Sequence, residues 1–217
     1  MLNITESNPV QLLAYVDRQL HNFFPDQQLD TTSIMARHFD ETLTRLQTCI
    51  NSVKLWKQDE FDYLHSSQYC IFLYYLSNTI WRNEQQQRLC TKLFYLNKAL
   101  NGIDLFYEID MPEKFFIGHS AGIVLAKAQY SNYLVLYQGV TVGKNHGAAP
   151  MLGERVILYP NSAVIGACEI ADGSVIAQGV SVTSANTPGN CLCFQGDAGA
   201  LLFKTSERDI IADFFRF

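Results

Sequence analysis

The chain has 217 residues, of which 48% are hydrophobic and 17% charged, and its net charge at pH 7 is -5. A chain of this length can bury a sizeable core. The charge argues against a nucleic-acid partner, because binding phosphates requires clustered Lys and Arg. No apolar run reaches the roughly 20 residues that span a bilayer, and the first residues lack the features of a signal peptide. We therefore expect a cytoplasmic protein with no membrane partner.

The first half of the sequence predicts helices. Asn8 followed by Pro9 is typical of a helix N-terminus, and aliphatic residues then recur at helical spacings until Pro25. At the other end of this half, Asn101 and Gly102 form a typical C-terminal stop. The four expected helices cover about 9–24, 32–50, 66–83 and 86–100. We expect residues 1–105 to form an α-helical domain.

The second half shows a six-residue spacing of aliphatic residues. Neither a helix nor a strand has this period, but a chain that turns a corner every six residues does, as in a hexapeptide β-helix. Stacked coils then bury a shared core that no single coil could bury alone. The residues in this phase are Leu152, Leu158, Val164, Ile170, Ile176 and Val182, with Val124, Tyr130, Leu136 and Val142 upstream; mostly small residues follow four positions later, at Val156, Ser162, Cys168, Ser174, Val180 and Asn186.

The spacing is interrupted once, because Val142 and Leu152 are ten residues apart. We expect a loop of about four extra residues in 143–150, and such an interruption of a rigid solenoid is where functional residues tend to lie. After residue 196 comes a C-terminal tail, 197–217, which ends in a short amphipathic segment. We expect that segment to cover the open end of the β-helix, where an exposed edge would promote aggregation.

Two of the five histidines lie in the repeat region, His119 in the first coil and His146 in the inserted loop. Small residues flank His119 and leave room for a ligand, and an imidazole can take a proton from a hydroxyl near neutral pH. Glu108 and Asp110 lie about ten residues upstream, and either could hold the other ring nitrogen of His119. The alternative is that His119 is an ordinary surface residue.

The order and content of these features resemble the serine O-acetyltransferase family. The resemblance covers about residues 60–196 and rests on His-Ser-Ala-Gly-Ile-Val at 119–124 and Tyr-Gln-Gly-Val-Thr-Val-Gly-Lys at 137–144. It implies an α+β fold in which the helical domain, 1–105, precedes a left-handed parallel β-helix at 106–196. It also implies that the helical domain serves oligomerisation and lies on the acceptor side of the site. It also implies acetyl-CoA as the co-substrate, bound between neighbouring subunits of a homotrimer or of a dimer of trimers. With serine as the acceptor, the reaction would belong to cysteine biosynthesis.

The resemblance also implies roles for individual residues. His119 matches the general base of the family, and the upstream carboxylate, Glu108 or Asp110, orients it. His146 matches a residue that helps to hold the acceptor. The full set expected on the acceptor side is His146, Asn145, Asp59 and His65, although the last two also fit a solvated loop between helices. The residues expected to contact CoA are Gly143, Lys144, Pro160, Gln178 and Gly179, each of which is also an ordinary corner residue of a solenoid.

The sequence departs from the family pattern in three places, one of which is a shorter segment between the upstream carboxylate and His119. Gly118 stands where an aspartate usually precedes the catalytic histidine, and Asn145 stands where an arginine precedes the loop histidine. The acceptor is therefore left open between serine, or a related amino acid, and a sugar or polysaccharide precursor. A non-catalytic trimeric assembly protein is a further alternative.

Metal chemistry is not expected. A hydratase of the hexapeptide type would need three histidines around a metal, and only His119 and His146 lie in the repeats. Cys191 and Cys193 would share one strand face, but we interpret the six cysteines as small buried residues. The expected mechanism is direct transfer, in which His119 deprotonates the acceptor hydroxyl and backbone N–H groups stabilise the oxyanion.

Overall fold

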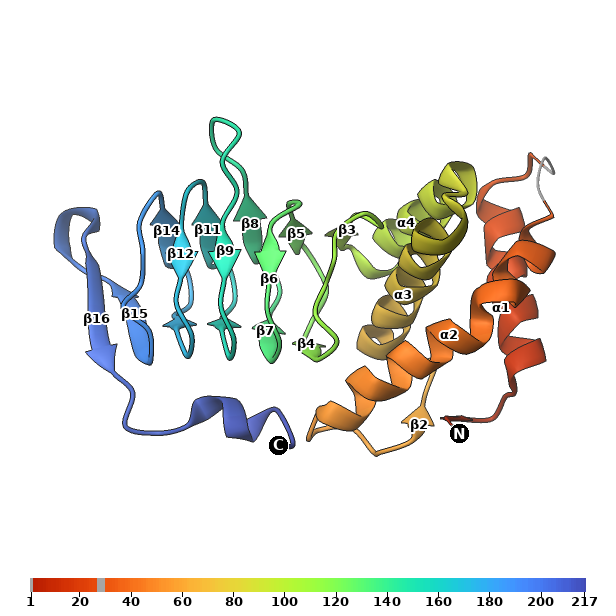
Figure 1. Cartoon of the computed structure of the whole chain (residues 1–217), viewed down its shortest axis with the longest axis horizontal. Coiled ribbons are helices and arrows are strands. Elements are labelled where there is room, and N and C mark those ends of the chain that lie inside the picture. Colours follow the sequence, from red (N-terminus) through yellow and green to blue (C-terminus); the bar gives the residue numbers. More distant parts are fainter. Residues whose placement is uncertain (1, 27–29) are drawn as a thin grey trace.

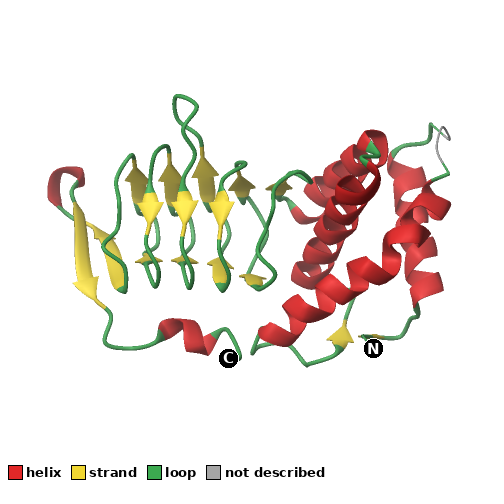
Figure 2. Ribbon diagram, in the orientation of Figure 1, coloured by secondary structure: helices red, strands yellow, loops and turns green. Residues whose placement is uncertain are grey.

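The computed structural model describes residues 2–26 and 30–217. Four helices pack together at one end of the molecule, and a stack of short strands forms a prism at the other (Figure 1). The helices and the stack of strands occupy separate halves, and the parallel pair β1 (Asn3–Ile4) and β2 (Glu60–Phe61) lies apart from the stack, beside the helices (Figure 2). The predicted fold class is confirmed.

The helices lie close to where the sequence predicts them. Their bounds are α1 (Pro9–Phe23), α2 (Thr31–Ser52), α3 (Ser66–Glu84) and α4 (Gln87–Asn101). The side-chain oxygen of Asn8 accepts a hydrogen bond from the N–H of Gln11 at 3.0 Å, as expected of an N-cap. Gly102 ends α4 with a φ of 65°, which glycine adopts without a Cβ penalty. Helix α3 is the centre of the bundle, because every residue from Ser67 to Ile80 is buried.

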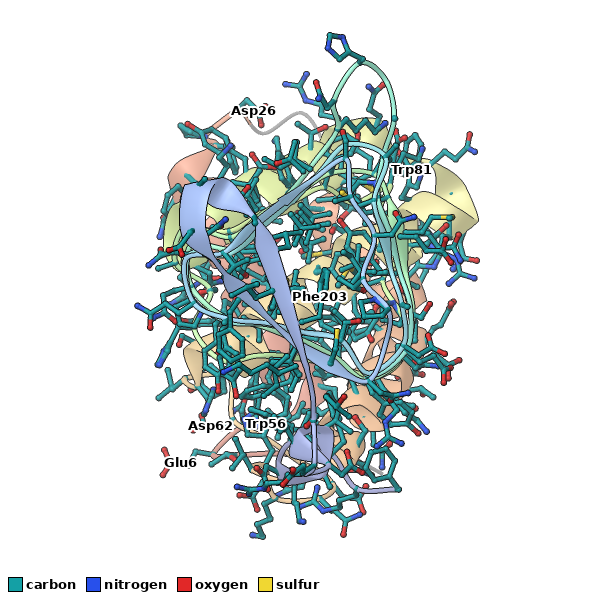
Figure 3. All side chains as sticks on the ribbon, turned by 90° about the vertical axis from the view of Figure 1, so that its left-hand side faces the viewer. Glu6, Asp26, Trp56, Asp62, Trp81 and Phe203 are labelled. Carbon is teal, nitrogen blue, oxygen red and sulfur yellow. The ribbon has the colours of Figure 1, made fainter. Side chains whose placement is uncertain are left out.

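The prism consists of parallel strands in three sheets, which make the three faces of a left-handed β-helix of about five coils. Sheet I contains β4 (Phe115–Ile117), β7 (Leu134–Leu136), β10 (Ile157–Leu158), β13 (Val175–Ile176) and β15 (Cys191–Gln195). Sheet II contains β3 (Asp104–Leu105), β5 (Val124–Leu125), β8 (Thr141–Gly143), β11 (Ala163–Ile165) and β14 (Ser181–Thr183). Sheet III contains β6 (Gln129–Tyr130), β9 (Met151–Leu152) and β12 (Glu169–Ile170). The coils lie one behind another when viewed along the prism (Figure 3).

The six-residue spacing from Leu152 to Val182 is confirmed, since each of its aliphatic residues is at most 1% exposed. The prediction for Val124 is wrong: this side chain is 45% exposed, and Leu125 takes the inward position beside Val142. Asn186 is likewise exposed, and Thr187 is buried in its place. Both exceptions lie in the end coils, where the next layer is the helical domain or the terminal hairpin rather than another regular coil.

The C-terminal residues take a different course from the one predicted. The strands β15 and β16 (Leu201–Thr205) pair antiparallel and extend sheet I at the far end of the prism. Residues 206–217, which we call the strap, then run back beneath the prism to the end of α2 (Figure 1). The expectation that the amphipathic segment covers the open end is therefore wrong. Its buried residues Ile211, Phe214 and Phe215 instead meet the side face formed by sheet I.

The helical domain and the prism share one core. The hydroxyl of Tyr74 on α3 donates to the carbonyl of Ile109 at 2.6 Å, and the Asn78 amide donates to the carbonyl of Tyr107 at 2.8 Å. These bonds fix α3 against the segment that leads into the first coil. Among the described residues, no helix combines the length and hydropathy required to cross a membrane.

Candidate active site

His119 lies in a two-residue bulge at the corner between sheets I and II. In the second coil the turn 137–140 follows the inward residue Leu136 directly, and the Val140 N–H donates to the Tyr137 carbonyl at 3.3 Å. In the first coil the equivalent turn is 120–123, three positions after Ile117, which pairs with Leu136. Gly118 and His119 are therefore extra residues, and the His119 side chain is exposed. A bulge of this kind re-aims a side chain away from the regular surface.

The bulge is held on both sides of His119. The Gly118 N–H donates to the Leu136 carbonyl at 2.9 Å, and the Ser67 hydroxyl at the start of α3 donates to the Gly118 carbonyl at 3.1 Å. The hydroxyl of Ser120 donates to the carbonyl of Asn101 at 2.6 Å. The backbone of the bulge is thus tied to the next coil and to two helices, while the imidazole extends outward.

An aromatic platform supports the bulge from below. The ring of Tyr137 lies against Gly118 and stacks on Tyr159, with ring centroids 5.6 Å apart and an interplanar angle of 21°. Phe116 and the strap residue Phe214 meet the Tyr137 ring edge-on at 6.4 and 6.3 Å. Burial raises the pKa of both Tyr137 and Tyr159 above the usual value for a phenol, so both rings are neutral at physiological pH.

Of the two residues predicted on the helical side, His65 lies beside the aromatic residues of this corner, whereas Asp59 bonds to α2. His65 caps α3, where its Nδ1 accepts from the Gln68 N–H at 3.5 Å, and its ring meets Trp56 at 5.8 Å. Trp56 in turn meets Phe116 at 5.4 Å. The Asp59 carboxylate accepts hydrogen bonds from Asn51 and Gln47 of α2, and these bonds lower its pKa. Its observed partners therefore lie on α2.

The upstream carboxylates are not seen bonded to the histidine. Glu108 forms an ion pair with Lys127, with 3.1 Å between Oε2 and Nζ, and Asp110 is exposed. Among the described residues, neither carboxylate forms a hydrogen bond with His119. Their role as partner of His119 stays a prediction.

The predicted loop projects from a different corner, between sheets II and III (Figure 1). It follows Gly143, the last residue of β8, and closes through two backbone hydrogen bonds of 3.0 Å between Asn145 and Ala148. His146 and Gly147 form the tip with φ angles of 47° and 82°. Lys144, Asn145 and His146 are all exposed. In one chain, sheet II separates this loop from His119.

The other residues expected to contact CoA lie on the same corner as His119, in later coils. Pro160 and Gln178 occupy the second position of the turns 159–162 and 177–180, and the N–H of Gly179 donates to the carbonyl of Pro160 at 3.0 Å. Successive coils are about 4.8 Å apart. These residues therefore form a row that continues from the bulge along the prism.

Sequence reasoning missed four residues that shape this corner: Ser67, Trp56, Tyr137 and Gln138. Gln138 lies in the turn that adjoins the bulge, and its side-chain oxygen is buried without a hydrogen-bond partner among the described residues. Tyr137 and Gln138 belong to the stretch 137–144 that carries the family resemblance, and Gln-Gly-Val recurs at 178–180, but neither signal indicated that these two residues lie against the bulge. Ser67 and Trp56 carried no signal, because they meet the bulge from the helical domain.

The cysteines are confirmed as buried residues, and all six are free. Burial raises the pKa of Cys49, Cys70 and Cys90 to about 12, which leaves their thiols protonated and unreactive. Within residues 2–26 and 30–217, no group of three or more His, Cys, Asp or Glu side chains is arranged to hold a metal ion.

The fold is that of serine acetyltransferases with solved structures. The soybean apoenzyme gives a TM-score of 0.56 at 17% identity over 64% of this chain, which spans only 58% of that enzyme's length. The Neisseria gonorrhoeae enzyme in complex with serine gives 0.65 at 15% identity, covering 88% of this chain and 83% of that one. A serine acetyltransferase in complex with CoA gives 0.63 at 17% identity, covering 90% and 79%. No family model and no curated protein matches the sequence.

Proposed function

We propose that this protein is an acetyl-CoA-dependent O-acetyltransferase of the serine acetyltransferase type, with His119 as its general base. The observation that carries the proposal is the bulge, which presents an exposed imidazole at the corner of a prism that has the fold of these enzymes. The CoA complex of one structural neighbour supports the donor, and the serine complex of another supports a small hydroxyl acceptor.

The reaction is a direct acyl transfer. His119 accepts the proton of the acceptor hydroxyl while the oxygen attacks the thioester carbonyl carbon. The carbonyl π electrons move to oxygen, where backbone N–H groups stabilise the negative charge. Collapse of this intermediate breaks the C–S bond, and the leaving thiolate takes the proton from the imidazolium. The products are the acetyl ester and the free thiol of CoA, and His119 returns to its neutral form.

The row of turns supports the placement of the donor. Pro160, Gln178 and Gly179 continue the corner that carries His119, at intervals of about 4.8 Å per coil. An extended thioester arm lying along this row would bring its acetyl group to the bulge. Gly143 and Lys144 belong to the loop corner and reach the same donor only from another subunit.

This division of residues between two corners supports a trimeric assembly. His146 and Asn145 project from the corner of sheets II and III, whereas His119 lies at the corner of sheets I and II. A rotationally symmetric oligomer places one corner of each subunit beside a different corner of the next. We therefore place the acceptor between His119 of one subunit and the loop of its neighbour, with Asp59 and His65 on the helical side.

The acceptor is either serine, or a related amino acid, or a sugar-type hydroxyl compound, and the contact between Gly118 and Tyr137 favours the sugar type. Serine or a related amino acid follows from the neighbour's complex. However, the Tyr137 ring leaves no room for any side chain at residue 118, so this position offers no carboxylate to an α-ammonium group. That contact favours a neutral hydroxyl acceptor, such as a sugar or a polysaccharide precursor.

The test is release of free thiol from acetyl-CoA in the presence of L-serine, L-homoserine or nucleotide sugars, preceded by calorimetry with CoA. We expect CoA binding and turnover with one acceptor of this panel. The remaining alternative, a non-catalytic assembly protein, predicts no binding of CoA at millimolar concentration. That result would overturn the proposed function.

A further inference from the structure

The end of the strap is clamped to the helical domain by one arginine. The guanidinium of Arg216 donates to the carbonyls of Asn51, Val53, Lys54 and Trp56, at 3.2, 2.5, 3.2 and 2.7 Å. Its backbone N–H also donates to the carbonyl of Ser52 at 2.8 Å. These acceptors are the last carbonyls of α2 and the connection after it, which lack partners within a helix. The planar guanidinium of an arginine holds its N–H donors in a fixed fork that can bond several of these carbonyls at once. A lysine ammonium group at the same place would act as a single point charge.

The clamped connection carries an aromatic wall of the candidate site. Trp56 is only 6% exposed and meets Phe116 at 5.4 Å and His65 at 5.8 Å. Phe214 of the strap meets Phe116 from another side, at 5.8 Å between ring centroids. Phe116 is two residues before Gly118. Figure 3 shows Trp56 at the edge of the molecule along which the strap passes.

A continuous chain of contacts therefore joins the C-terminus to the bulge. It runs from Arg216 through Trp56 to Phe116, and from Phe214 through Tyr137 to Gly118. The strap has a second polar anchor at Lys54, whose N–H donates to the Phe214 carbonyl at 2.7 Å and whose ammonium group donates to the Ala212 carbonyl at 3.0 Å. The last residues of the chain thus hold the aromatic wall and the platform under His119 together.

We propose that Arg216 is a positioning residue for the acceptor half of the reaction, acting through Trp56 and Phe116 on the bulge of His119. The inference rests on the proposed function and adds to it a role for the C-terminal end. Since displacing a catalytic group by about 1 Å can cost about a hundredfold in rate, loss of the clamp should reduce transfer strongly without unfolding the chain. Among the described residues, the guanidinium of Arg216 bonds only to carbonyls of α2 and of the connection after it, so donor binding at Pro160 and Gln178 should persist.

The experiment uses the full chain with Trp81→Phe. Since the chain has two tryptophans, this change leaves Trp56 as the single one. Arg216→Ala removes the clamp, and Arg216→Lys keeps the charge but not the fork. The matched control is Arg208→Ala. Arg208 also belongs to the strap, but its guanidinium is mostly exposed and binds the Asp213 carboxylate rather than the carbonyls at the end of α2. Each variant is measured for CoA binding by calorimetry, for iodide quenching of Trp56 fluorescence, and for kinetics with the acceptor of the panel above that turns over fastest.

We expect Arg216→Ala to lower kcat/KM for the acceptor by about tenfold or more, with less than about a twofold change in the Kd for CoA. Iodide should quench Trp56 more strongly in this variant, Arg216→Lys should be intermediate, and Arg208→Ala should match the parent. If the acceptor kinetics of Arg216→Ala are unchanged, or if CoA binding and transfer fall equally, the role of Arg216 is overturned while the proposed function stands. Absence of both CoA binding and turnover in the parent would overturn the proposed function and this inference with it.

Discussion

The ring of Tyr137 lies directly against the α-carbon of Gly118. A Cβ at residue 118 would be 2.6 Å from Cε1 and 2.8 Å from Cδ1 of that ring, well inside van der Waals contact. The ring cannot retreat easily, because it stacks on Tyr159 and meets Phe116 and Phe214. The glycine is therefore required by its neighbour in the next coil, and the pair sets how far the bulge projects.

Gly118→Ala should destabilise the protein by about 1–3 kcal/mol, as expected for an overpacked site. In the double variant with Tyr137→Ala, the added methyl group should cost much less, because the ring it meets is gone. Urea unfolding of the four proteins in this cycle measures the coupling. The control is Gly143→Ala, where the nearest atom to a new Cβ would be 3.6 Å away. Additive effects of the two changes would contradict this account of the bulge.

The inward spacing gives a second matched pair of variants. Val164 and Val124 belong to the same sheet, but Val164 is fully buried and Val124 is 45% exposed. Val164→Asp should abolish folding or assembly, because an unpaired buried charge costs several kcal/mol. Val124→Asp should remain folded, with a change within about 0.5 kcal/mol. Circular dichroism and size-exclusion chromatography distinguish the outcomes, and equal damage from both changes would show that the first coil is wrongly placed.

The positions where sequence and structure disagree share a physical cause. Periodicity located the inward residues from Leu152 to Val182, because each regular coil repeats the same environment. It failed at Val124 and Asn186, where a coil meets a different neighbour and its corners change length. It also misplaced the strap, since the burial of Phe214 depends on Phe116, which lies about a hundred positions earlier in the chain.

In the candidate site, too, residues marked by a local sequence pattern could be predicted, whereas residues that act through tertiary contacts could not. His119 could be selected from the sequence as a candidate, because a histidine among small residues stands out within the repeat and matches a family pattern, and its catalytic role stays a prediction. Ser67, Trp56 and Arg216 were not, because each contacts its partner through tertiary structure rather than through a local motif. The relationship of Gly118 to Tyr137 required the register of β4 with β7, which spacing alone does not give.

The helical domain contains an ion-paired carboxylate that should make stability depend on pH. Hydrogen bonds from Arg37, and then from His38, lower the pKa of Glu84 from 4.5 to about 2. A carboxyl group whose pKa is lower in the folded state stabilises the fold above pH 4.5, and this contribution is lost as the pH falls toward 2. Glu84→Gln should therefore have a lower free energy of unfolding than the parent at pH 7. This difference between the two proteins should shrink as the pH is lowered toward 2.

Urea unfolding between pH 7 and about pH 2.5 measures this convergence. The control is Glu207→Gln, which removes an exposed carboxylate near the C-terminal end of the chain. Its free energy of unfolding should differ from that of the parent by the same amount at every pH. A difference for Glu84→Gln that stays constant over the whole range would contradict the assigned cause.

A shared site makes a prediction for mixed oligomers. His119→Ala and His146→Ala should each be poorly active alone, because every interface lacks one histidine. Mixing the two by co-expression and isolating the trimers that contain both should restore about a third of the parental activity, since one interface in three of such a trimer combines an intact His119 with an intact His146. Tandem affinity purification followed by the thiol-release assay measures this value. Failure of the mixture to exceed either variant would place both residues in one chain's site, or His146 outside it.

The central claim, that an exposed imidazole on the bulge performs acyl transfer, is tested most directly by thiol release from acetyl-CoA with His119→Ala. The account predicts a fall in kcat of about a hundredfold to ten-thousandfold. It also predicts a midpoint of thermal unfolding within about 2 °C of the parent, because replacing an exposed side chain costs little. Retention of most of the activity, or a loss of activity that follows a loss of folded protein, would contradict it.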